Sequence, residues 1–124
     1  MQRIENRSTC YGYYVLAWAD ADVADELIDW LVKGHVREVV EQPGMIDAKV
    51  TVFSEPTAEG RVGVLCAYRL GSQQDLFDYL ASAAKSRFDE EARAFAGRIT
   101  TTRWHGPESL CLTSVDDLIP DAAE

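Results

Sequence analysis

Two side chains in this sequence have the chemistry of an acid–base pair. His35 is one of only two histidines in the 124 residues, and Tyr68 ends a stretch in which residues alternate between two faces. An imidazole gains and loses a proton near neutral pH, and a neutral phenol donates a hydrogen bond. If the fold brings the two together, His35 could act as a general base and Tyr68 as a general acid.

Other residues could hold a ligand beside this pair. Arg69 or Arg103 could bind an anionic or enolate oxygen, because a guanidinium stabilises negative charge on oxygen. Further polar and aromatic candidates for contacts with a small organic ligand are Tyr13, Trp30, Asp47 and Trp104.

Each candidate also has a plainer structural explanation. A histidine on a helix is often packed with one hydrogen bond, and a tyrosine at a strand end can send its hydroxyl to solvent. Asp47, Lys49 and Arg69 could form cross-strand ion pairs. Trp30 and Trp104 could pack at the edge of the core or in a dimer. The choice depends on the elements that position these side chains.

The charge of the chain argues against two classes of partner. Asp and Glu outnumber Lys and Arg by 21 to 12, which gives a formal net charge of −9. A surface of that sign repels phosphate backbones and anionic lipids, so we expect no nucleic-acid and no membrane partner. The chain has no run of 18 apolar residues and no apolar segment near its start, which predicts a cytoplasmic protein.

The sequence also gives no sign of a metal or cofactor site. Cys10, Cys66 and Cys111 are far apart and form no C-x-x-C motif, so we read them as reduced thiols. A spaced set of metal ligands, a P-loop and a dinucleotide-binding motif are all missing. We therefore predict no metal and no cofactor.

The pattern of apolar residues predicts four strands and two helices. The first helix is capped by Asp22 and stopped by Pro43-Gly44, and the second is capped by Ser72. In chain order the elements are a strand at 10–19, a helix to residue 42, a hairpin of strands at 45–53 and 61–70, a helix to Gly97 and a strand at 98–105. At about 25 residues the second helix is long, so we expect a kink near residues 83–86.

This order of elements predicts an α+β domain of the ferredoxin-like βαββαβ type. Right-handed crossovers give a four-stranded antiparallel sheet of order 4-1-3-2 with both helices on one face. One end of that sheet gathers His35, Tyr68, Arg69 and Arg103. At 100° per residue Trp30 lies about 140° from His35 on the helix, so we predict that these two rings do not stack.

The domain is predicted to span residues 10–106. Residues 1–9 are interpreted as a flexible lead-in. Residues 107–124 form an acidic tail that keeps apolar residues, and we expect it to pack, with a second subunit as one candidate partner.

The residues from Trp30 to Val40 resemble the W-x-x-x-x-H-x-x-E-V signature of a bacterial family of uncharacterised domains in the dimeric α+β-barrel superfamily. Residues 75–80, 87–95, Gly97 and Arg103 are similar to the second helix and last strand of that family. A related pattern occurs in EthD-like proteins. The resemblance covers roughly residues 11–106, and it carries over Trp30, His35, Glu38 and Arg103.

The resemblance implies a homodimer in which two open sheet faces approach each other. Its superfamily contains cofactor-free monooxygenases, cyclases, isomerases and haem-degrading enzymes, so the fold alone does not choose a function. In this sequence Val36 follows His35 where the family often has proline, and Ser82-Ala83 replace an expected polar or histidine position.

Three functional hypotheses remain open. The leading one is a homodimer that binds a small organic molecule and could perform cofactor-independent acid–base chemistry of the cyclase, isomerase or monooxygenase kind. The second is a non-catalytic dimeric interaction or regulatory module. The third is haem chemistry, which would require His35 as an axial ligand.

Overall fold

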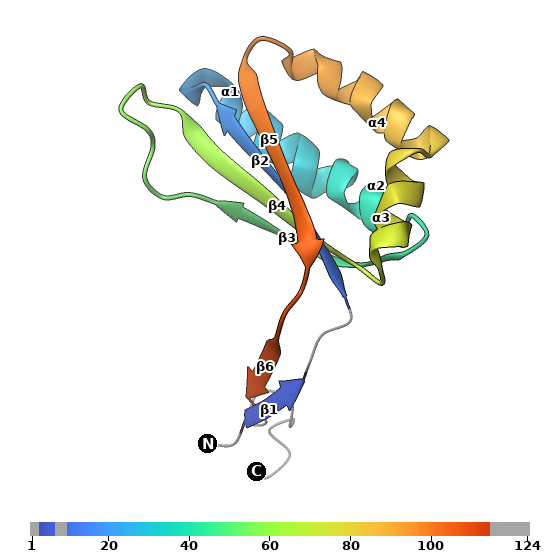
Figure 1. Cartoon of the computed structure of the whole chain (residues 1–124). Helices are drawn as coiled ribbons and strands as arrows, with labels where there is room; N and C mark the ends of the chain where they lie inside the picture. The colour runs from blue at the N-terminus through green and yellow to red at the C-terminus, as the bar shows by residue number, and fades with distance from the viewer. Residues whose placement is uncertain (1–2, 7–9, 115–124) are drawn as a thin grey trace, which may run out of the picture.

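A four-stranded antiparallel sheet forms the body of the protein (Figure 1). The computed structural model describes the backbone of residues 3–6 and 10–114 and the side chains of residues 10–110. The four strands are β2 (Tyr11–Ala19), β3 (Met45–Val52), β4 (Val62–Leu70) and β5 (Ile99–Pro107). Their order in the sheet is β3-β4-β2-β5, which confirms the predicted 4-1-3-2 order and the ferredoxin-like fold.

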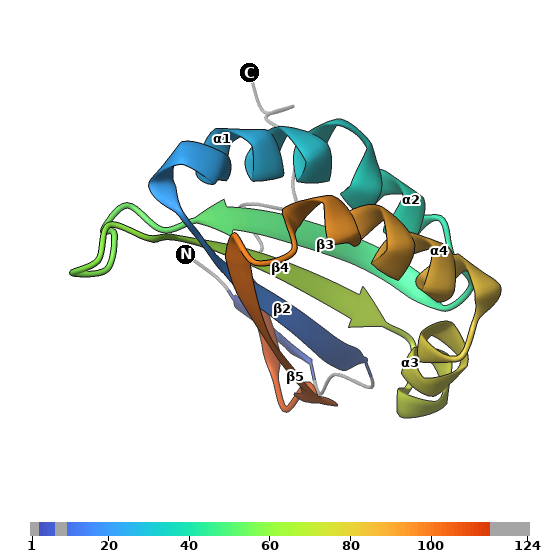
Figure 2. The same cartoon turned by 90° about the horizontal axis from the view of Figure 1, so that it is seen from above.

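Helices cover one face of this sheet (Figure 2). The first covering helix consists of α1 (Ala21–Trp30), a π-helical turn (Leu31–His35) and α2 (Val36–Val40). The second is α4 (Ala83–Ala92), which is followed by a 3₁₀ turn (Arg93–Phe95). The shorter helix α3 (Gln73–Leu80) lies at the end of the sheet. Within the described residues, no helix covers the opposite face.

The second predicted helix is divided rather than kinked. Helix α3 begins after Ser72, whose hydroxyl oxygen accepts a hydrogen bond from the Asp75 amide at 3.1 Å. Ser82 repeats this arrangement with the Lys85 amide at 3.1 Å and starts α4. A serine in this position satisfies an amide that has no partner inside a helix. The expected kink is therefore a complete break, because Ser82 caps a new helix.

The core lies between the sheet and its helices. Alternate residues of β4, including Val64, Cys66 and Tyr68, point toward the helices and are buried. The pairing of β3 with β4 shifts between Met45 and Asp47, and this bulge leaves Ile46 49% exposed.

The two ends of the described chain form a second, smaller sheet. Strand β1 (Arg3–Asn6) pairs antiparallel with β6 (Cys111–Ser114) beyond one end of the main sheet (Figure 1). Part of the expected lead-in and part of the expected tail are thus regular strands. Residues 115–124, the rest of the tail, lie outside the described residues. In the part of the chain that is described, no helix has the length and apolar character needed to span a membrane.

Candidate functional site

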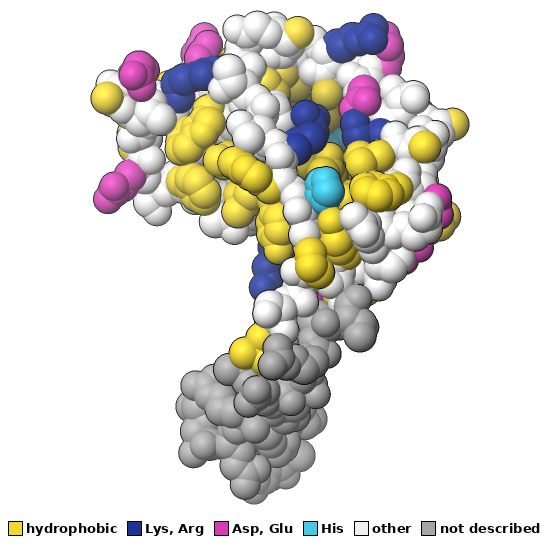
Figure 3. Space-filling model, in the orientation of Figure 1, with side chains coloured by type: hydrophobic (Ala, Val, Ile, Leu, Met, Phe, Trp, Pro, Cys, Tyr) yellow, Lys and Arg dark blue, Asp and Glu magenta, His cyan; other side chains and the backbone are white. Residues whose placement is uncertain are grey.

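A cavity lies between the helix-covered face of the sheet and the helices α1 and α4. Its volume is ≈ 90 Å³, enough for several water molecules, and it is partly open to solvent, so a small organic molecule can lie partly inside it and extend outward. Five of the eight predicted site residues line it, namely Tyr13, Trp30, His35, Tyr68 and Arg103. On the face that contains β5, Figure 3 shows hydrophobic side chains together with basic and acidic groups near α4.

His35 lies in the cavity wall between aromatic rings. Its ring stacks on Trp30 with 4.1 Å between centroids and a tilt of 14°, and it meets Phe88 at 5.2 Å in an edge contact. The prediction that Trp30 and His35 do not stack is wrong. It assumed 3.6 residues per turn, whereas the wider π-helical turn at Leu31–His35 brings residue i+5 back close to the position above residue i.

The His35 imidazole is neutral near pH 7. Burial, together with the nearby positive charge of Lys85, lowers its pKa from 6.5 to about 4, and Asp89 acts in the opposite direction. The Nδ1 atom is buried and has no hydrogen-bond partner among the described residues. A buried polar atom without a partner is costly, and a bound molecule could supply the missing hydrogen bond.

Phenol groups form the floor of the cavity. Tyr13 and Tyr68 face each other across β2 and β4, with ring centroids 6.0 Å apart. Burial raises the pKa of both phenols and also that of Tyr79. For Tyr13 and Tyr79 the nearby Arg103 partly offsets this effect. All three hydroxyls therefore stay protonated at neutral pH and can donate hydrogen bonds.

Helix α4 adds a pair of charged residues that the sequence analysis missed. Lys85 and Asp89 form an ion pair, and both line the cavity. The lysine side chain is only 15% exposed, whereas that of Asp89 is 54% exposed. These residues share one helix face with Phe88 and Ala92 at three- and four-residue spacing. That three- and four-residue spacing is the signal in the sequence that could have identified Lys85 and Asp89.

Cys66 is a further lining residue that was not predicted as part of a site. Its side chain is buried beside Tyr68, and burial raises the pKa of its thiol to about 11. The thiol is therefore protonated at neutral pH and is a poor nucleophile there.

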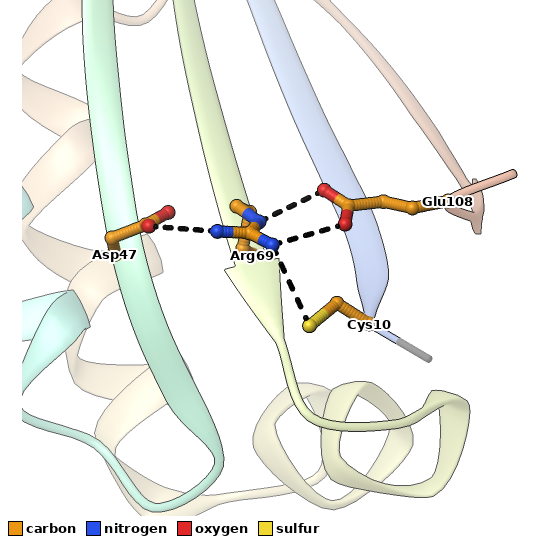
Figure 4. A network of polar contacts seen from close by, with 4 residues as sticks. All are labelled: Cys10, Asp47, Arg69 and Glu108. Carbon is orange, nitrogen blue, oxygen red and sulfur yellow. Dashed lines mark hydrogen bonds and ion pairs between the residues drawn. The ribbon is translucent and has the colours of Figure 1, made fainter. Parts of the chain in front are cut away.

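Arg69 and Asp47, two predicted ligand-binding residues, lie on the other face of the sheet (Figure 4). The Arg69 guanidinium donates to Asp47 at 3.2 Å and to both carboxylate oxygens of Glu108 at 2.9 and 3.2 Å. It also lies 3.6 Å from the Cys10 sulfur. The contacts with Glu108 and then Asp47 raise the pKa of Arg69. We refer to these four residues as the Arg69 cluster.

The alternation of strand side chains explains this separation. Arg69 follows Tyr68 in β4, and Trp104 follows Arg103 in β5, so the members of each pair point to opposite faces. Trp104 is 52% exposed on the open face. The structure does not bring Asp47, Arg69 or Trp104 into the cavity.

The second histidine lies outside the cavity lining. The Nδ1 atom of His105 lies 2.7 Å from the Tyr11 hydroxyl oxygen, and its ring meets the edge of Phe77 at 6.1 Å between centroids. Across residues 3–6 and 10–114, no group of three or more His, Cys, Asp or Glu side chains could hold a metal ion.

Comparison with known families assigns the chain to one of them. Residues 10–104 match the profile of DUF4286, a domain of unknown function. The chain belongs to this family. No curated protein matches it.

Solved structures of similar shape share the fold at low sequence identity. A protein of the ethyl tert-butyl ether D (EthD) family from Bacillus halodurans is 18% identical with a TM-score of 0.62, over 79% of this chain and 98% of that chain. A dimeric ferredoxin-like protein from an uncultured marine organism is 11% identical with a TM-score of 0.61, over 80% and 94%. SnoaB, a cofactor-independent oxygenase from Streptomyces nogalater, is 11% identical with a TM-score of 0.57, over 79% and 92%.

Proposed function

We propose that this protein binds a small organic molecule in the cavity beside His35 and performs acid–base chemistry on it without a cofactor. The observation that carries the proposal is the buried Nδ1 of His35, which has no partner among the described residues although it lies at a cavity lined by phenols. An apolar cavity with a few convergent polar groups is the usual form of a small-molecule site.

In this proposal the neutral imidazole of His35 accepts a proton from the ligand. Its pKa is lowered, so it is unprotonated over the physiological range and available as a base. Tyr68 has a raised pKa and donates a hydrogen bond to the oxygen on which charge develops. Arg103 lies at the same cavity and takes the charge-stabilising role. Arg69 has no part in this site, because its side chain is bound on the opposite face.

The comparisons support the class of chemistry only indirectly. SnoaB, which shares the fold, is described as a cofactor-independent oxygenase. Its sequence identity to this chain is low, so the similarity supports a common fold and the reaction has to be tested by experiment.

The proposal includes a homodimer formed through the open sheet face. By the alternation along β2 and β4, that face carries the apolar and aromatic side chains Tyr14, Leu16, Trp18 and Leu65, and β5 adds Trp104. The similar marine protein is described as dimeric. Aromatic side chains are frequent in protein interfaces, which makes this face the best surface for a second copy.

A ligand screen tests the proposed site. Small acids, phenols and polyketide-like compounds would be screened by thermal shift, since a ligand that binds the folded state raises the melting temperature. We expect at least one compound to raise the Tm of the wild type and to lose most of this effect with His35→Ala and with Tyr68→Phe. His105→Ala is the matched control, because His105 lies outside the cavity lining. Equal shifts in all variants would contradict the proposal.

The rival hypothesis is a non-catalytic interaction module. The observation that favours it is the uncovered aromatic face, which could serve assembly alone. Under this hypothesis no compound would produce a His35-dependent shift, while substitutions on the open face would still change the oligomeric state.

A further inference from the structure

The cavity differs in charge from the rest of the protein. Two cations, Lys85 and Arg103, line it with a single carboxylate, Asp89. The chain as a whole carries a formal charge of −9. A local excess of positive charge attracts anions and repels cations. In an otherwise acidic protein, the positive sign of this cavity therefore indicates an anionic ligand.

Lys85 occupies an electrostatically unfavourable position. It is the third residue of α4 and lies next to the Ser82 cap, where the partial positive charge of the helix disfavours a cation. Its side chain is also largely shielded from water, at 15% exposed. Asp89, one turn later on the same helix, offsets part of this cost. Because the Asp89 side chain is 54% exposed, water screens its carboxylate, and Lys85 can still attract an incoming anion beside it.

Arg103 supplies a second positive charge at the same part of the cavity. Its charge and that of Asp89 both act on the phenols Tyr13 and Tyr79, which places the two charged groups close to the same rings. Among the residues that the structure describes, no carboxylate forms an ion pair with Arg103. Its guanidinium contacts the Tyr13 hydroxyl and has further N–H donors for a ligand oxygen.

We propose that the ligand of this cavity is an aromatic carboxylate, with its anionic group between Lys85 and Arg103 and its ring against Trp30, Tyr13 and Phe88. This inference rests on the proposed function, since it names the class of molecule that the same cavity takes. The lining supplies flat aromatic surface for the ring, and Lys85 and Arg103 supply positive charge for the carboxylate.

Binding of such an anion would also change His35. Lys85 lowers the pKa of this imidazole at present, and a carboxylate beside Lys85 would offset that effect. The ligand would thus raise the pKa of His35 and strengthen it as a base. This gives a measurement that needs no knowledge of the reaction.

Benzoate and benzamide form a matched pair of probes, because they have nearly the same shape and differ in charge. Each would be titrated into the full-length protein at low salt, with the His35 ring signals followed by NMR at several pH values. We expect benzoate to bind at least about tenfold more tightly than benzamide, to raise the pKa of His35, and to bind more weakly as salt is added.

Substitutions test whether Lys85 and Arg103 cause the preference for benzoate over benzamide. Lys85→Met and Arg103→Met should each reduce the preference for benzoate several-fold, and Lys85→Gln serves as a second variant if the methionine disturbs folding. Lys49→Met, on the open face, and Arg93→Met, on an exposed turn, are the matched controls and should leave the preference unchanged.

The outcomes separate this inference from the proposed function. Equal binding of the two probes, or an unchanged preference in Lys85→Met and Arg103→Met, would overturn the carboxylate proposal and leave the cavity as a binding site. If neither probe binds while a screened compound does, the carboxylate proposal is wrong and the proposed function stands. If no compound binds in a saturable manner, both are wrong.

Discussion

At the scale of single residues, His35 is held by aromatic neighbours. Trp30 lies on one face of the imidazole and Phe88 meets it at 88°, so the ring has little freedom to turn. Burial in these surroundings keeps the ring neutral. The properties of His35 that matter for a site therefore come from packing as much as from the residue type.

The lowered pKa of His35 predicts a pH dependence of stability. Between pH 6.5 and about 4 the unfolded chain binds a proton at His35 that the folded protein does not bind, so the free energy of unfolding falls as the pH is lowered. After allowance for partial solvent screening, we expect this contribution to reach about 2 kcal/mol. Urea unfolding at a series of pH values measures it.

Two variants isolate the contribution of His35. His35→Gln should flatten the difference in stability between pH 7 and pH 5, whereas His105→Gln keeps His35 and so should keep its pH dependence. An unchanged slope in His35→Gln would show that the imidazole is not protected from protonation in the folded protein.

The chemistry of the residue types was sufficient to select part of the candidate site from the sequence. His35, Tyr68, Tyr13, Trp30 and Arg103 were singled out from the sequence, and the structure places them around one cavity. Asp47, Arg69 and Trp104 share the end of the sheet with the other candidates, but strand alternation places them on the opposite face.

At the scale of elements, the first helix departs from regular geometry at Leu31–His35. Nothing in the residues of this turn distinguishes it from an ordinary helix, because Leu, Val, Lys, Gly and His all occur in both. A π-helical turn depends on the packing around it, and such turns are frequent at functional sites. The stacking of Trp30 on His35 could therefore not be predicted from periodicity.

Gly34, inside that turn, offers a test of the helix. A Cβ atom built at Gly34 meets nothing within 4 Å, and the backbone there is not left-handed. Gly34→Ala should therefore stabilise the protein by about 0.5 to 1 kcal/mol, because alanine has less conformational freedom to lose on folding. Chemical denaturation measures the change.

Gly44 provides the opposite case. Its φ is +86°, and an added Cβ would lie 2.6 Å from the Asp75 Cβ. Gly44→Ala should destabilise the protein by more than 1 kcal/mol, since alanine would be strained and would displace the start of α3. If both glycine variants had the same sign, the assigned backbone at one of them would be incorrect.

The break between α3 and α4 depends on one serine. Ser82 caps α4 through the Lys85 amide, and its hydroxyl donates to the Tyr79 carbonyl at 2.6 Å. Ser82→Ala should lower the free energy of unfolding by about 1 kcal/mol. Ser82→Asp can still cap the helix and should retain most of the stability. An equal loss in both variants would argue against the cap as the cause.

At the scale of the whole molecule, the order of strands and helices was predictable and the ends were not. The alternating residues of the strands and the residues that end the helices predict the order βαββαβ. Right-handed crossover connections then give a single strand order for the sheet. The pairing of β1 with β6 joins segments from opposite ends of the chain. Arg3–Asn6 is polar and short, and only its partner strand reveals that it is a strand.

The proposed dimer predicts a change in assembly. Trp104 is 52% exposed on the open face, so Trp104→Glu would place a charge in the proposed apolar interface. We expect the wild type to sediment as a dimer and Trp104→Glu to shift toward monomer. Phe77→Glu is the control, because Phe77 is 43% exposed on α3 and away from that face. A wild-type monomer would contradict the proposed assembly.

The ribbon of β1 and β6 also has a consequence for the order of folding. Asn6 pairs with Cys111, so almost the whole chain lies between the two strands, and closing so large a loop in an unfolded chain is entropically costly. The cost falls once the main sheet has brought Cys10 and Glu108 together, as the hydrogen bond from the Glu108 amide to the Cys10 carbonyl shows at 3.0 Å. The ribbon should thus be the last part to form and the first to open, and its amides should exchange with deuterium before those of β2 and β4.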